Sequence, residues 1–141
     1  MKELDTVLHL RREIDKLQDR LQELKIMTQP KAQTISDMPR GGERKNTIEE
    51  YVMKSEELNS KLGKLEKRMD RKWRDVLSML SHCEITDAQC VMLRLRFYCG
   101  YPWKKVVKEM KRLYTETTWN ENKVFSMYRR ILYKIDKRKH E

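Results

Sequence analysis

The sequence predicts an all-α protein, in which long N-terminal helices form a hairpin or coiled coil and shorter helices follow. Glycine and proline together occupy only seven of 141 positions, too few for the turns of a β-sandwich or barrel. Charged residues make up 38% of the chain, and leucines recur among them at helical spacing. The pattern changes after Leu80, so we predict two domains, over residues 1–81 and 82–141.

A heptad seam predicts the first helix, over Glu3–Met27. The apolar positions are three and four residues apart in alternation, which is the spacing of coiled-coil a and d positions. They are Val7, Leu10, Ile14, Leu17, Leu21 and Leu24. A helix of this kind is marginally stable alone, so the seam is expected to pack against a partner.

A loop over residues 29–45 is expected next, because it holds Pro30, Pro39 and two glycines. A second long helix is predicted to begin near Asn46 or Thr47, either of which can cap it. Its apolar residues continue the heptad spacing and then slip by one position before Trp73. Antiparallel packing on the first helix buries both seams within one chain, although pairing between chains satisfies the same pattern.

The C-terminal domain is predicted to hold three helices. Thr86 is expected to cap a helix that begins at Asp87 and ends at Gly100, with Arg94 and Arg96 on its outer side. A short helix follows Pro102, and Thr118 with Glu121 forms a capping box for the last helix. The apolar face of that helix is expected to hold Val124, Tyr128, Ile131 and Ile135. Two short helices joined by a turn are typical of a helix-turn-helix.

Net charge indicates the kind of partner. The chain carries a net charge of +10, and residues 82–141 hold 14 Lys and Arg against 7 Asp and Glu. A basic domain favours polyanionic partners. Three dispersed cysteines and three dispersed histidines predict no disulfide framework, metal site or cofactor. Glycine-rich phosphate loops and nucleophile motifs are missing from the sequence, so we expect no enzyme. No apolar run approaches the ~18 residues of a membrane span.

Residues 86–135 resemble region 4 of bacterial sigma-70 factors. The resemblance lies in the run from Val91 to Gly100, followed by Trp103 and the Val106–Val107 pair. Residues 35–42, with the sequence ISDMPRGG, resemble a loop in small phage and prophage proteins related in function to the ArpU- and RinA-type late transcription regulators. The chain departs from the sigma pattern at Lys104 and Lys105, where acidic residues are usual, and at Val107, where a small residue is usual.

The resemblance implies that the last helix docks in the DNA major groove. Its first turns are expected to face base edges, and its later cations and the start of the preceding helix are expected to contact phosphates. The candidate DNA-binding residues are Lys104, Lys105, Asn120, Asn122, Lys123, Ser126, Met127, Arg129, Arg130 and Lys134.

The sequence therefore predicts a phage-type, DNA-binding transcriptional regulator of the bacterial cytoplasm. Double-stranded DNA is the expected partner, RNA polymerase is a possible second one, and the coiled coil could form a homodimer. Two alternatives remain open. One is a DNA-packaging protein similar to a small terminase subunit. The other is a protein-interaction module that binds polymerase or another host protein without reading DNA.

Overall fold

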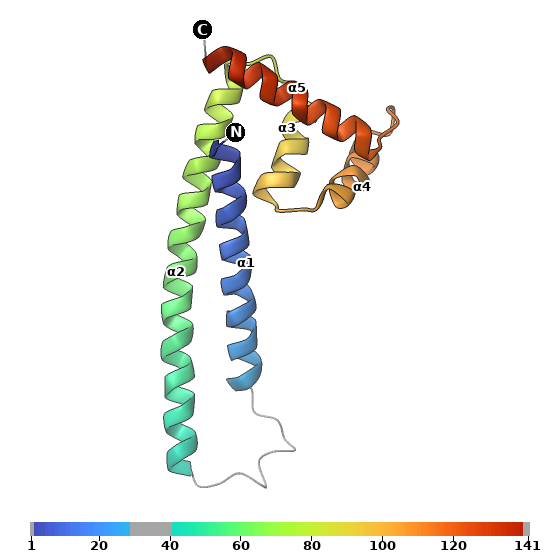
Figure 1. The fold of residues 1–141 in the computed structure, drawn as a ribbon. Coiled ribbons are helices and arrows are strands. Elements are labelled where there is room, and N and C mark those ends of the chain that lie inside the picture. Colours follow the sequence, from blue (N-terminus) through green and yellow to red (C-terminus); the bar gives the residue numbers. More distant parts are fainter. Residues whose placement is uncertain (1, 29–40, 140–141) are drawn as a thin grey trace. The chain divides into compact units, whose positions relative to one another are not determined.

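A computed structural model describes residues 2–28 and 41–139 of the chain (Figure 1). All the regular secondary structure in these two ranges is helical, which confirms the predicted all-α class. In chain order the helices are α1 (Lys2–Thr28), α2 (Gly41–Ser81), α3 (Asp87–Leu93), the π-helical turn η2 (Arg94–Tyr98), α4 (Trp103–Leu113) and α5 (Glu121–Lys139).

The chain forms two compact units. One unit comprises residues 13–67, and the other comprises residues 1–12 together with residues 68–141. The second unit therefore combines the start of α1 and the end of α2 with all of the C-terminal helices. The sequence predicts two domains that are each one continuous segment, divided after residue 81. That division concerns independently folding domains and stays a prediction.

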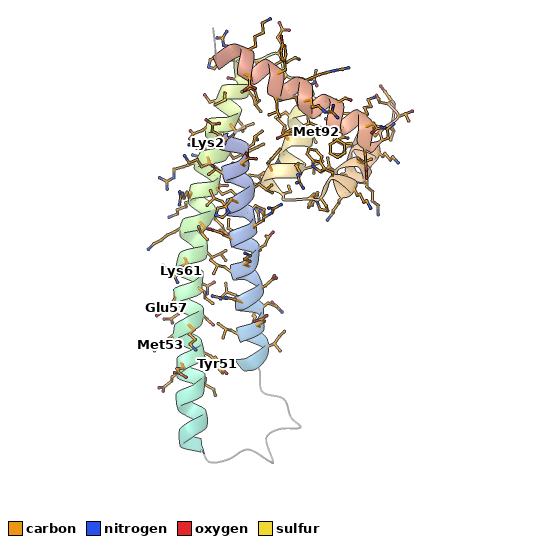
Figure 2. All side chains as sticks on the ribbon, in the orientation of Figure 1. Lys2, Tyr51, Met53, Glu57, Lys61 and Met92 are labelled. Carbon is orange, nitrogen blue, oxygen red and sulfur yellow. The ribbon has the colours of Figure 1, made fainter. Side chains whose placement is uncertain are left out.

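The unit of residues 13–67 is an antiparallel pair of helices, made of the later part of α1 and the earlier part of α2 (Figure 1). Figure 2 shows Met53, Glu57 and Lys61 along α2, where Met53 is 63% exposed. Glu57 and Lys61 border a groove shared with α1. Leucines of both seams line the space between the two helices, where Leu24 and Leu58 border the same groove. The predicted hairpin is therefore present in this unit.

The start of α2 differs from the prediction. The helix begins at Gly41, so the predicted caps at Asn46 and Thr47 are wrong and lie inside the helix. Residues 43–45 are Glu, Arg and Lys, which are good helix formers and extend the helix towards its N-terminus. The rest of the predicted loop, residues 29–40, lies outside the described residues.

The other unit holds most of the buried core. Its members come from each of the five α-helices, from η2 and from the turn before α5. Those with at most 8% of their surface exposed are Leu4, Val7, Leu10, Met69, Trp73, Val76, Leu80, Met92, Leu93, Phe97, Val106, Val107, Met110, Trp119, Val124, Ile131 and Ile135. The predicted seam of α1 is therefore fully covered only in its first half.

Helix α3 begins where the sequence predicts. The Thr86 side chain accepts a hydrogen bond from the Gln89 N–H at 3.2 Å, and the Gln89 side chain accepts one from the Thr86 N–H at 3.0 Å. This reciprocal pair satisfies two backbone donors at the start of the helix. The helix runs on through Tyr98, close to the end predicted at Gly100, but its last turn is π-helical at η2, where the Cys99 N–H donates to the Arg94 carbonyl.

Arg96 does not lie on the outer side of the helix as predicted. Its guanidinium lies 4.9 Å from the centre of the Trp103 ring and donates to the Tyr101 carbonyl at 3.0 Å. Burial lowers the pKa of Arg96, and the nearby charge of Arg12 lowers it further. The π-helical turn brings this cation back over the loop that leads into α4.

Gly100 is the one described residue with a positive φ, at +73°. A Cβ atom here would lie 2.7 Å from Cγ of Arg11, whose Nε donates to the Tyr98 carbonyl. Gly100→Ala is therefore expected to lower the free energy of unfolding by about 1–3 kcal/mol, through backbone strain and displacement of Arg11. Gly63 is the matched control, because a Cβ there meets no atom within 4 Å.

Gly63→Ala is expected to stabilise α2 by up to about 1 kcal/mol, since alanine is the better helix former. Urea unfolding of the two variants, followed by circular dichroism, measures both effects. Equal stability of the two variants would contradict the role assigned to Gly100.

Tyr98 joins the start of α1 and the end of α2 to the C-terminal helices. Its hydroxyl donates to Oδ1 of Asp70 at 2.7 Å, its ring lies 5.6 Å from that of Trp73, and the Arg11 guanidinium lies 5.7 Å from its ring centre. The hydrogen bond to Asp70 is the main cause that raises the pKa of Tyr98 above its usual value, and burial adds to it.

A raised tyrosine pKa gives a signed prediction about stability. The folded state favours the neutral phenol, so this contribution is fully present below about pH 10, the pKa of a free tyrosine, and is lost as the pH rises further. Tyr98→Phe is expected to be less stable than the parent at pH 8, with a difference that shrinks at alkaline pH. A difference that is constant or grows from pH 8 to about pH 11 in urea titrations would rule out this account.

Candidate nucleic-acid interface

An aromatic cluster sets how α4 packs against α5. The ring of Trp103, the first residue of α4, lies 5.2 Å from that of Phe125 and 5.3 Å from that of Tyr128. The Phe97 ring stacks on that of Tyr128, with 5.6 Å between the ring centres. Aromatic pairs at these distances add to the stability gained by burial. The contact places the first turn of α4 beside the first half of α5.

Trp119 organises the turn between α4 and α5. Its ring is 5% exposed, and its Nε1–H donates to the Tyr114 carbonyl at 3.1 Å. The ring also lies 6.3 Å from the Tyr114 ring and carries the Lys123 ammonium 4.8 Å from its centre. The seven residues between the two helices are thus fixed by one anchored indole.

Helix α5 is capped by Asn120, and the predicted capping box at Thr118 is wrong. The helix begins at Glu121, and the Lys123 N–H donates to Oδ1 of Asn120 at 2.8 Å. The buried indole of Trp119 fixes the backbone immediately before the helix, so the cap falls two residues later than predicted. A bidentate contact of Asn120 with adenine needs that same oxygen, so Asn120 acts as a cap in this structure.

The two sides of α5 differ as the sequence predicts. Val124, Ile131 and Ile135 are at most 1% exposed, and Tyr128 is half-buried beside them. Burial is the main cause that raises the pKa of Tyr128, and the carboxylate of Asp5 raises it further. The core side of the helix is therefore apolar and carries a neutral phenol at neutral pH.

The opposite side of α5 holds most of the predicted DNA-binding residues. Asn122, Ser126, Arg129 and Arg130 are exposed, and Lys123, Met127 and Lys134 are half-buried. Lys123 and Arg130 are seven residues apart, which is close to two helical turns, so they lie on one stripe. The structure thus presents cations and short polar side chains together on a single helix face.

Lys104 and Lys105 lie in the first turn of α4, as predicted. Both side chains are exposed, and the Lys105 ammonium lies 3.9 Å from the centre of the Tyr101 ring. An N-terminal turn with two lysines favours a phosphate group, since the positive end of the helix dipole and the two charges act in the same direction.

Sequence reasoning missed the loop contact of Lys134. Its ammonium donates to the carbonyl of Glu84 at 2.6 Å, which ties α5 to the segment between α2 and α3. It also missed the aromatic cluster, although the spacing of Phe125 and Tyr128 three residues apart on a helix would have indicated a shared face.

Cysteines and potential metal ligands also occur in residues 2–28 and 41–139. No group of three potential metal ligands occurs there, and Cys83, Cys90 and Cys99 are free thiols. None of the helices in these ranges has the length and apolar content needed to cross a membrane. Comparisons with protein-family models, curated proteins and solved structures found no match.

Proposed function

We propose that this chain is a phage-type DNA-binding transcriptional regulator, in which α4 and α5 form a helix-turn-helix similar to that of sigma-70 region 4. The observation that carries the proposal is the exposed cationic face of α5, opposite a fully buried apolar face. Duplex DNA is the proposed partner, with RNA polymerase as a second one, in the cytoplasm of a bacterial host.

The residues divide by the part of the duplex that they would contact. Asn122 and Ser126, in the first two turns of α5, have the donor and acceptor groups that read base edges in a major groove. Lys104, Lys105 and Arg130 have the charge that phosphates attract, and such contacts position a protein without specifying sequence. Four to six phosphate contacts would give a slope of about −4 to −5 for log affinity against log salt.

Selection from random duplexes tests the proposal. A regulator is expected to return one compact motif, and the affinity for that motif should fall with salt at the slope given above. Retention of DNA without any enriched motif would instead favour a packaging protein or an interaction module. Rings in electron micrographs would favour packaging, and capture of polymerase without motif enrichment would favour an interaction module.

The hairpin unit supports a homodimer as part of this proposal. Leu17, Leu21, Leu58 and Leu62 are only half-buried, and the exposed apolar side chains of the unit include Met53, at 63%. A second copy would cover these seams in a bundle of four helices. Light scattering is expected to give about twice the chain mass of 17.2 kDa. A mass of one chain at the concentrations used for DNA binding would contradict the dimer.

A further inference from the structure

A groove along the second half of α5 extends beyond the predicted DNA-binding residues, of which Arg129, Arg130 and Lys134 line one part of it. It has a volume of about 730 Å³ and lies between α5 and residues 82–84, within one compact unit. Its lining residues are His82, Cys83, Glu84, Arg129, Arg130, Tyr133, Lys134, Lys137 and Arg138. Five of these nine are Lys or Arg, and Glu84 is the one carboxylate among them.

The groove continues the cationic stripe of α5. Lys123, Arg130 and Lys137 follow one another at seven-residue intervals, so they lie almost above one another along the helix over about 21 Å. Tyr133 is 69% exposed beside this stripe, with its ring and hydroxyl available to a ligand. Lys134 holds the opposite wall in place through its hydrogen bond to the Glu84 carbonyl.

The length of α5 explains why such a groove would meet a phosphate strand. Helix α5 has 19 residues and is therefore about 28 Å long, whereas the major groove of B-DNA is about 12 Å wide. Because the groove winds around the duplex and the helix is straight, a helix whose first turns contact bases brings its second half towards a backbone strand. The helix rises about 13 Å from residue 129 to residue 138, which is long enough to meet more than one phosphate of the same strand.

We propose that this groove binds the sugar-phosphate backbone of the DNA strand that borders the major groove. Lys137 and Arg138 contact phosphates, and the exposed Tyr133 packs against the adjoining sugar and donates its hydroxyl to a phosphate oxygen. The assignment rests on the proposed function and adds a second contact region to it. An acidic peptide is the less favoured ligand, because cations in register along a rigid helix match a charged strand of regular spacing.

The test removes two groove cations that the helix-turn-helix does not use. Lys137→Gln with Arg138→Gln is expected to make the slope of log affinity against log salt shallower by about 1.8. With the affinities of parent and variant equal when extrapolated to 1 M salt, the variant binds about 60-fold more weakly than the parent at about 0.1 M salt. The motif selected from random duplexes should not change, because phosphate contacts carry no sequence information. Tyr133→Phe keeps the aromatic ring and removes the hydroxyl, so its affinity in the same assay measures the hydroxyl contact alone.

Lys61→Gln with Lys64→Gln is the matched control. It removes the same charge from exposed positions of the other compact unit, so it should leave the slope and the motif unchanged. Thermal melting of both double variants within about 2 °C of the parent shows that the fold is retained.

Other results of these assays would overturn the groove assignment, or the proposed function with it. A groove variant with the slope of the parent, while the parent binds its motif, overturns the groove assignment and leaves the proposed function standing. Equal losses in the groove and control variants also overturn it, because net charge alone then accounts for the effect. Displacement of the parent from DNA by polyglutamate but not by heparin identifies an acidic-peptide site. A parent that binds no duplex at about 50 mM salt overturns the proposed function together with this assignment.

Discussion

Replacing both Lys123 and Arg130 with alanine is expected to weaken binding to duplex DNA at least about eightfold at about 0.1 M salt, from the phosphate contact of Arg130 alone. The loss of the Lys123 contact in the first turn of α5 adds to this. Each phosphate contact contributes about 0.9 to the slope of log affinity against log salt, or about eightfold in affinity per tenfold change in salt. The two cations lie on one stripe of α5, and Arg130 is exposed. Titrations of labelled duplex at several salt concentrations give both the affinity and the slope.

Lys123 also has a structural contact that the measurement must separate. Its ammonium lies 4.8 Å from the centre of the Trp119 ring, and a contact of this kind is worth about 0.5–1 kcal/mol at an exposed site. Lys123→Arg keeps both the charge and the ring contact, so it should retain most of the affinity. A double alanine variant that binds as tightly as the parent, with an unchanged slope, would remove α5 from the DNA-contact surface.

The sequence predicts those parts of this fold that depend on local pattern. The first helix, the Thr86 cap, the position of Gly100 and the buried side of α5 follow from spacing and from single-residue preferences. The α2 start at Gly41 was missed because glycines next to a proline usually indicate a loop. The π-helical turn at Arg94–Tyr98 was missed because it depends on tertiary contacts that no local pattern encodes.

The residues of the candidate site were likewise predictable only where they depend on local sequence pattern. The amphipathic pattern of α5 predicts which side is buried, so the exposed cations could be named from the sequence. Their partners could not, because the Trp119 ring beneath Lys123 and the Glu84 carbonyl bound by Lys134 depend on how loops pack. The groove beside residues 82–84 has the same origin, since it joins segments about 50 residues apart in the chain.

Trp119→Ala is expected to cause the largest loss of stability, about 3–5 kcal/mol, because it removes a large buried side chain and leaves a cavity. The indole is 5% exposed and donates to the Tyr114 carbonyl, which would lose its partner. The Lys123 ammonium would lose the ring beneath it. Urea unfolding followed by circular dichroism measures the loss.

Trp119→Phe separates packing from hydrogen bonding. It keeps an aromatic ring in the pocket but removes the N–H donor, so the expected loss is smaller, about 1–3 kcal/mol. If Trp119 also sets the direction in which α5 begins, the phenylalanine variant should bind DNA more weakly even where it is fully folded, because Asn120, the cap of α5, follows the indole directly. Unchanged affinity in a folded Trp119→Phe variant would mean that the ring alone positions the helix. A stability loss below 1 kcal/mol for Trp119→Ala would show that the turn holds its shape without the indole.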